Sequence, residues 1–345
     1  MSGFPVLDVF ERNRGGIAGT LCMLGAPGQV PAGAGGDSIH TLTTHFGQWE
    51  QQGGHGCCWY FGYDDPELPA VFDHVIIFMP KARSELAMRC AWAVSRIRPG
   101  GEIWLVGAKK EGIAGGARRF SERFPDAYKA DSARHCQLWK ARIGEDIAAT
   151  PFRITDWLSE APVHIGSESL SLFSLPGLFS EGRLDPGTEL LLGTIAERPQ
   201  GPVLDVACGN GVIGAWLAHS WPDLELTLTD VQWQAVTCAR WAMGDHERAR
   251  VVASDGLSRA GSDYGTIITN PPFHQGVATD SRVTETLIGQ APAHLAPHGE
   301  IRLVANAFLP YSRSLERAFG KVKVLADDGD YRVYQAFREG YSRKK

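Results

Sequence analysis

Asp205-Val-Ala-Cys-Gly-Asn-Gly-Val-Ile-Gly214 is the stretch that decides the fold class of this chain of 345 residues. It begins at the end of an apolar run and leads into a helical pattern, so its glycines fall in a strand-to-helix turn. Glycines in such a turn let the backbone pass close to a nucleotide-like ligand without a clash from a Cβ atom. The stretch therefore predicts a parallel α/β sheet that binds a nucleoside-containing cofactor.

The identity of that cofactor depends on acidic residues around the turn. The pattern Gly-x-Gly-x-x-Gly by itself fits NAD and S-adenosylmethionine equally well. Asp205, four residues before Gly209, favours S-adenosylmethionine, because a carboxylate there can pair with the cationic end of that cofactor. Asp230 ends the next predicted strand, where an acid accepts hydrogen bonds from ribose hydroxyls. Asp255 ends the third, where it either reads the adenine amino group or only forms an Asp-Gly turn.

A second motif, Asn270-Pro-Pro-Phe273, lies where the fourth strand should end, at the edge of the sheet where ligands bind. The Asn270 side-chain carbonyl and the Pro271 backbone carbonyl can accept both N–H groups of an exocyclic base amine, which orients its nitrogen for methyl transfer. Pro271 and Pro272 fix φ and remove N–H donors. Phe273 offers a stacking face for a flipped-out base. The motif predicts methylation of an amine on a nucleobase.

Parts of the chain repeat each other. Phe72–Pro80 resembles Tyr264–Pro272, an apolar strand that ends in proline, and Pro99–Val106 matches Pro297–Val304. A helical stretch lies between the two repeated segments in both halves. The first half has Met79-Pro-Lys81 in place of the Asn-Pro-Pro-Phe motif, and it has no glycine loop. We therefore expect a duplicated α/β domain in which only the C-terminal copy keeps the chemical motifs.

The C-terminal copy alternates strands with helices, which predicts a parallel sheet with helices on both faces. Its strands are expected at Val203–Val206, Glu225–Thr229, Arg250–Ala253, Thr266–Thr269 and Glu300–Ala305. A final pair, Lys321–Ala326 and Tyr331–Phe337, meets at Asp-Asp-Gly-Asp, a hairpin signal. The expected fold class is α/β, with two tandem Rossmann-like domains of the class I methyltransferase type. The N-terminal domain is degenerate, and the C-terminal one has a seven-stranded sheet that ends in an antiparallel hairpin.

We expect the degenerate domain in residues 1–160, a lead-in segment in 161–200 and the cofactor-binding domain in 201–345, with few elements placed in the first 70 residues. The composition, 43% hydrophobic and 21% charged, is that of a globular protein. No apolar run approaches the roughly 18 residues of a membrane helix, and the N-terminus has no apolar signal-peptide core. The seven cysteines form a poor disulfide framework. We therefore expect a cytoplasmic, reduced protein.

The net charge of −5 hides a basic block. Residues 75–142 carry 14 basic and 6 acidic side chains, a local excess of +8 that suits a polyanion. A solvated helix face is the alternative explanation. The basic candidates for such a contact are Lys109, Lys110, Arg118, Arg119, Arg123 and Arg134.

With these motifs, the chain resembles the ribosomal RNA small subunit methyltransferase C family, the 16S rRNA guanine-N2 methyltransferases. Leu175-Pro-Gly-Leu-Phe-Ser180, followed by Leu184-Asp185, is similar to the lead-in of that family, and Val304–Pro310 also matches its pattern. The resemblance runs from about residue 70 onward. Ala207 departs from it, because the family usually has a glycine there, and we expect its methyl group to tighten the cofactor loop.

The resemblance implies a methyl donor, a substrate and a role for each matching residue. The donor is S-adenosylmethionine, no metal is needed, and the partner is 16S rRNA or the small ribosomal subunit, with the enzyme a monomer that contacts no membrane. Catalytic roles fall on Asn270, Pro271, Pro272 and Phe273. Cofactor contacts fall on Phe179, Asp205, Ala207, Gly209, Gly211, Asp230, Asp255 and Asn270. His274, beside the motif, either contacts base or phosphate or is a surface histidine, and Phe179 is either a pocket wall or a core aromatic. The excess of basic residues in the N-terminal copy is the reason to expect that this copy docks rRNA.

Other functions remain open at this point. Protein-glutamine and DNA amino methyltransferases also use Asn-Pro-Pro, although commonly with Tyr where this chain has Phe273. A large-subunit rRNA guanine-N2 methyltransferase has the same tandem plan. An NAD-linked oxidoreductase would share the Gly-x-Gly-x-x-Gly pattern, although no clear hydride-transfer histidine supports it. An RNA-binding scaffold without activity would fit the basic block, but the intact Asn-Pro-Pro-Phe motif argues against it.

Overall fold

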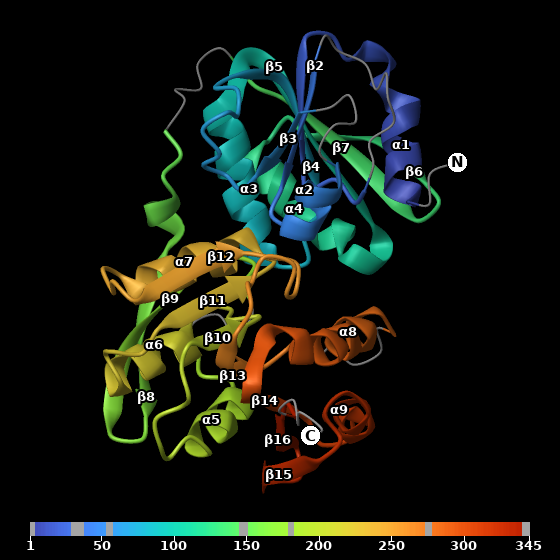
Figure 1. Ribbon diagram of the computed structural model, residues 1–345. Coiled ribbons are helices and arrows are strands. Elements are labelled where there is room, and N and C mark those ends of the chain that lie inside the picture. The colour runs from blue at the N-terminus through green and yellow to red at the C-terminus, as the bar shows by residue number, and fades with distance from the viewer. Residues whose placement is uncertain are drawn as a thin grey trace. The chain divides into compact units, whose positions relative to one another are not determined.

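The chain is described by a computed structural model over residues 4–28, 38–52, 58–144, 151–178, 183–272 and 278–339; side chains are described there except in 278–281. It divides into two compact units, Met1–Leu158 and Ser159–Lys345, each built around its own seven-stranded sheet (Figure 1). None of the helices in these ranges has the length and apolar character needed to cross a membrane.

The sheet of the second unit has the order β12-β11-β10-β13-β14-β16-β15. Its strands are β10 (Val203–Val206), β11 (Leu226–Asp230), β12 (Ala249–Ala253), β13 (Tyr264–Thr269), β14 (Leu295–Asn306), β15 (Val322–Asp327) and β16 (Tyr331–Phe337). β12, β11, β10, β13 and β14 run parallel, while β16 is antiparallel to both β14 and β15. The predicted seven strands and the terminal hairpin are confirmed.

Helices cover both faces of this sheet, because its central strands are apolar on both sides. The helices are α6 (Val212–Ser220), α7 (Trp233–Met243), α8 (Ala278–His294) and α9 (Tyr311–Phe319). All six residues of β13 are buried. Alternate residues enter different cores, Val203 and Ile268 on one face and Leu204 and Ile267 on the other. Asp205 shares the face of Val203, since side chains alternate along a strand.

Between the two sheets in sequence lies a hairpin of β8 (Ser159–Ile165) and β9 (Glu168–Ser174), followed by α5 (Pro186–Gly193). Both belong to the second unit: β9 packs against α7, and α5 packs against β14 and β16. Asp185 begins α5 as its N-cap, accepting a hydrogen bond from the Thr188 N–H at 3.0 Å. The stretch predicted as a lead-in therefore carries a helix that lies against the sheet of the cofactor-binding copy.

The first unit repeats the same strand order, β3-β2-β1-β4-β5-β7-β6. Its strands are β1 (Thr20–Leu24), β2 (Ser38–Thr43), β3 (Cys58–Phe61), β4 (Phe72–Phe78), β5 (Ile97–Ala108), β6 (Tyr128–Ala133) and β7 (Cys136–Arg142). Its helices are α1 (Pro5–Asn13), α2 (Phe46–Gln52), α3 (Arg83–Arg96) and α4 (Ile113–Arg123). The expected duplication is confirmed, and it includes three strands and two helices within the first 70 residues that the sequence left unassigned.

Candidate active site

The predicted cofactor residues meet at one edge of the second sheet. Asp205 lies in β10, Asp230 ends β11, Asp255 follows β12 and Asn270 follows β13. These four strands are parallel neighbours in the order β12-β11-β10-β13, so their carboxyl ends lie side by side. This is the edge at which open α/β sheets bind ligands.

Asp205 is a buried acid, 1% exposed. Among the described residues, no donor makes a hydrogen bond of standard geometry to either of its carboxylate oxygens. Burial, and then the charge of Asp230, raise the pKa of the Asp205 carboxyl well above its usual value, and the backbone amide of Gly214 opposes them only in part. An ionised carboxylate in such a place needs a cation. The site therefore fits the cationic end of S-adenosylmethionine.

The three glycines of the loop serve different purposes. Gly209 has φ 55°, and a Cβ added there would meet no atom within 4 Å, so it borders open space. A Cβ on Gly211 would lie 3.0 Å from the Cα of Ala239, and one on Gly214 would lie 2.5 Å from a Cδ atom of Leu228. Gly211 and Gly214 thus permit close helix packing, whereas Gly209 leaves room for a ligand.

Asp230 fastens the glycine loop to the next strand. Its Oδ2 accepts a hydrogen bond from the Gly209 N–H, and its Oδ1 accepts one from the Gln232 N–H, both at 2.9 Å. The predicted ribose-binding acid is therefore held in a fixed orientation at the rim of the loop. Asp255 differs from Asp230 in its exposure. It comes directly after the buried Ser254, and Asp255 itself is exposed.

Ala207 adopts a left-handed backbone conformation, with φ 58°. A residue with a Cβ atom pays a conformational penalty of about 1 kcal/mol or more in that region, and glycine does not. Alanine in place of the family glycine therefore strains the backbone of the loop. The tightening of the cofactor loop expected from the sequence stays a prediction.

We expect Ala207→Gly to raise the free energy of unfolding by roughly 0.5 kcal/mol, since relief of the strain exceeds the extra entropy that glycine loses on folding. Denaturant unfolding measures the change. Ala215→Gly, inside α6, is the matched control and should lower stability by about 1 kcal/mol. Equal losses in both variants would show that Ala207 is unstrained.

Asn270 is held by a helix that precedes the sheet in sequence. Its Nδ2 donates to Oδ2 of Asp185 and to Oγ1 of Thr188, each at 2.8 Å. Because an ionised carboxylate only accepts hydrogen bonds, the amide must turn its nitrogen toward Asp185. The Asn270 carbonyl oxygen consequently faces away from the Asp185 carboxylate. Asp185 and Thr188 position this amide, and the sequence did not predict that contact.

The remaining residues of the motif are only partly described. Pro271 is buried and Pro272 is exposed. Phe273 and His274 lie outside the described residues, as does Phe179, so the predicted stacking face, phosphate contact and pocket wall stay predictions. Within the described ranges, no group of three His, Cys, Asp or Glu side chains could hold a metal ion.

Comparison with known proteins identifies the family. Models of the methyltransferase small domain and of its N-terminal domain match residues 169–335 and 12–161. The ribosomal RNA small subunit methyltransferase C of Pseudomonas entomophila is 38% identical over 97% of this chain and 99% of its own length. That of Hahella chejuensis is 37% identical over 96% and 98%. The chain belongs to the ribosomal RNA small subunit methyltransferase C family.

A solved member of the family has the same fold. The 16S rRNA N2 methyltransferase of T. thermophilus, in complex with AdoMet and guanosine, superposes with a TM-score of 0.83 over 98% of this chain and 92% of its own. Its sequence identity is 22%, so the likeness concerns architecture. Both tandem domains are included in the match, which agrees with the duplicated strand order.

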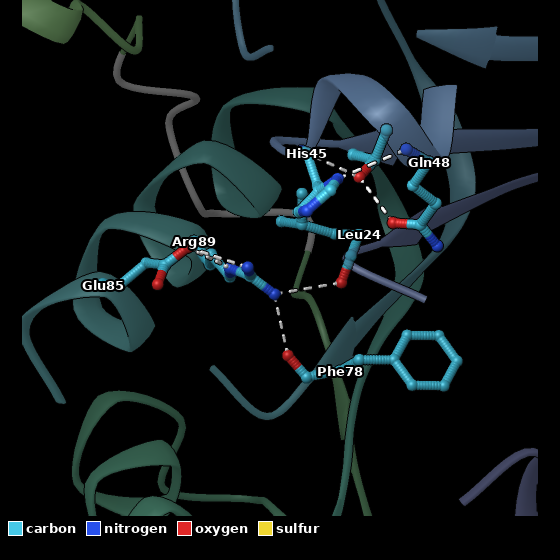
Figure 2. Close-up of polar contacts among 7 residues, drawn as sticks. Leu24, His45, Gln48, Phe78, Glu85 and Arg89 are labelled. Atoms are coloured by element: carbon cyan, nitrogen blue, oxygen red, sulfur yellow. Dashed lines mark hydrogen bonds and ion pairs between the residues drawn. The ribbon is translucent and has the colours of Figure 1, made fainter. Parts of the chain in front are cut away.

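The equivalent edge of the first sheet is occupied by an arginine. Equivalence follows from the register, because Met23 pairs with Ile76 as Asp205 pairs with Ile268. Figure 2 shows Arg89 of α3 reaching this edge. Its Nη1 donates to the backbone carbonyls of Phe78 at 2.9 Å and Leu24 at 3.3 Å.

Two neighbours fix this arginine in place. Glu85 pairs with it at 2.7 Å, and both side chains are almost wholly buried. A Cβ added to Gly25 would lie 2.2 Å from the Arg89 Nη1, so the glycine makes room for the guanidinium. In this copy a buried, paired cation lies at the sheet edge where the other copy has Asp205, an acid without a hydrogen-bond partner of standard geometry among the described residues.

The six basic residues predicted to bind rRNA all lie on the surface of the first unit. Arg118, Arg119 and Arg123 are exposed on α4, while Lys109 and Lys110 form the short turn that precedes it. Arg118 pairs with Glu122 at 3.2 Å. Arg134, at the turn between β6 and β7, pairs with Asp8.

Proposed function

We propose that the chain transfers a methyl group from S-adenosylmethionine to the N2 amine of a guanine in 16S rRNA. Membership of the family supports the class of reaction, and the T. thermophilus structure with AdoMet and guanosine supports the choice of cofactor and base. The observation that carries the proposal is the Asn270 amide, anchored by Asp185 and Thr188 at the same sheet edge as the buried Asp205.

The residues at the edge fit S-adenosylmethionine, which supplies a methyl group on a cationic sulfur. Asp205 would balance the positive charge of the methionine end, and the open space beside Gly209 would admit the ligand. Asp230 would accept hydrogen bonds from the ribose, and Asp255 would meet the adenine. Ala207 and Gly211 would shape the loop around them, and no metal takes part.

Catalysis in this proposal comes from orientation and fixed dipoles. The exocyclic amine of guanine is a weak nucleophile because its lone pair is delocalised into the ring. The Asn270 and Pro271 carbonyls would accept its two N–H groups, turn the lone pair toward the methyl donor and stabilise the positive charge that develops on nitrogen. Pro272 would keep that backbone rigid, and Phe273 would stack on the flipped base.

The proposed substrate is the small ribosomal subunit or its rRNA. We propose that the enzyme acts on it as a monomer in the cytoplasm. A large-subunit rRNA would be the substrate of the related tandem enzymes. Labelled methyl transfer to purified 30S and 50S subunits from cells that lack the gene separates the two. Label in the 30S subunit is the expected result, and label confined to the 50S subunit would contradict the proposal.

The basic residues of α4 are proposed to bind rRNA phosphates. We expect the double variant Arg118→Glu, Arg119→Glu to weaken rRNA binding and to flatten its dependence on salt, because fewer counterions are released. Cofactor binding should be unchanged, since both residues lie outside the cofactor-binding unit. Filter binding over a salt series measures this. The same affinity and slope as the wild type would remove α4 from the rRNA contact.

A further inference from the structure

A trough of about 570 Å³ lies in the first unit, between α4 and the outer strands β6 and β7. Ala114 and Ala117 line it from the helix, and Trp139 lines it from β7. The indole is held in place, since its Nε1 donates to Oε1 of Gln137, on the same face of the strand, at 3.0 Å. The trough thus presents a fixed aromatic ring beside small side chains.

The second unit provides an internal comparison for this ring. Trp139 pairs with Leu105 in the first sheet, and Tyr334 pairs with Leu303 in the second, so the two aromatics hold equivalent positions. Tyr334 is 1% exposed and belongs to a closed core. Trp139 keeps part of its surface accessible. The aromatic side chain at this position is therefore buried in the second unit and partly exposed in the first. An exposed aromatic ring at the rim of a trough indicates a surface for binding.

The rim of the trough is cationic. Lys129 pairs with Trp139 across the two strands, so both side chains point to the same face; the equivalent residue in the second sheet is Val324. Arg118, 81% exposed on α4, lines the other side, with Glu122 as its ion-pair partner. An aromatic wall with positive side chains beside it complements a flat base and its phosphate.

We propose that this trough binds one unpaired base of 16S rRNA, stacked on Trp139, with its flanking phosphates against Lys129 and Arg118. The inference rests on the proposed rRNA substrate and adds a contact separate from the base that is methylated. Stacking on an aromatic ring tolerates any base, so this contact anchors the rRNA without selecting the methylated guanine. The volume of the trough, about 570 Å³, lies within the range of roughly 300–1,000 Å³ that is usual for small-molecule sites.

The test compares Trp139→Ala with Trp139→Phe in the full chain, with Tyr128→Ala as the matched control. Tyr128 is 56% exposed on β6, one position from Lys129, so it lies on the opposite face of the sheet. Affinity is measured for protein-free 16S rRNA over a salt series. We expect Trp139→Ala to lose about ten-fold in affinity at an unchanged salt slope, Trp139→Phe to lose less than about three-fold, and Tyr128→Ala to match the wild type.

Several outcomes would overturn this site. Wild-type affinity in Trp139→Ala, or an equal loss in Trp139→Phe, would exclude stacking, and a loss seen only with assembled 30S subunits would assign the trough to a ribosomal protein. If Trp139→Ala does not fold, Lys129→Gln decides, since unchanged affinity and salt slope in that variant exclude the site. Normal methyl transfer by the wild type alongside any of these results would leave the proposed function intact.

Discussion

Asp205→Asn should make the cofactor-free protein more stable and at the same time unable to bind S-adenosylmethionine. The buried carboxylate has no hydrogen-bond partner of standard geometry among the described residues, so its charge opposes folding. Removing a charge of this kind should outweigh the buried amide that replaces it, and raise the unfolding midpoint by about 5 °C. Loss of the charge pair with the ligand should weaken cofactor binding by about 100-fold or more.

The gain in stability should depend on pH. Because the pKa of Asp205 is raised in the folded protein, the folded state holds its proton to higher pH than the unfolded chain. The free energy of unfolding is therefore highest below about pH 4, the usual pKa of an aspartate in an unfolded chain. It falls as the pH rises from there toward the pKa of Asp205 in the folded protein. Asp205→Asn should remove this part of the pH dependence, so that its advantage is larger at about pH 8 than at about pH 4.

Thermal unfolding with and without the cofactor, together with calorimetric titration, measures both effects. Asp245→Asn is the control, since that carboxylate is exposed in the same unit and should leave stability and affinity unchanged. A lower midpoint in Asp205→Asn would mean that the carboxylate is satisfied in the folded protein. Wild-type affinity would mean that it does not face the cationic end of the ligand.

Asn270→Ala should lower kcat for methyl transfer by about 100-fold to 1,000-fold, the usual effect of removing one preorganised polar group from a transition state. The variant should still bind S-adenosylmethionine, because the acidic residues and the glycine loop are untouched. Single-turnover transfer of labelled methyl groups to 30S subunits measures the rate. A half-active Asn270→Ala enzyme would contradict the proposed hold on the amine.

Variants of Asp185 provide the comparison for Asn270. Asp185→Ala leaves the Asn270 amide with Thr188 alone, so we expect kcat to fall about ten-fold while KM and cofactor affinity stay near those of the wild type. Asp185→Asn keeps an acceptor for the amide and for the N-cap of α5, and should restore most of the rate. Equal losses in kcat and stability for both variants would indicate a purely structural role.

The parts of the fold that the sequence predicted are those with local signals. The strands that lead to Asp205, Asp230 and Asn270 are short apolar runs bounded by Gly, Pro or Asp, and such boundaries are visible without tertiary information. The hairpin of β15 and β16 was marked by its turn residues in the same way. The duplication was visible because the repeated segments lie in the apolar cores of both sheets.

The contacts that were missed join distant parts of the chain. Asp185 and Asn270 are 85 residues apart, and only the packing of α5 on the sheet brings them together. Arg89 counted toward the basic block of residues 75–142, yet it is 7% exposed and paired with Glu85. A charge count along the sequence does not distinguish a solvated arginine from one that fills a sheet edge.

The identity of the methylated nucleoside tests the proposed reaction most directly. Small subunits from cells that lack the gene are incubated with the purified protein and labelled S-adenosylmethionine, and the 16S rRNA is digested to nucleosides and analysed by mass spectrometry. We predict a single labelled product, N2-methylguanosine, formed by the wild type and formed about 100-fold or more slowly by Asn270→Ala. Label on another base, or on another atom of guanine, would contradict the proposed role of the Asn-Pro-Pro-Phe motif.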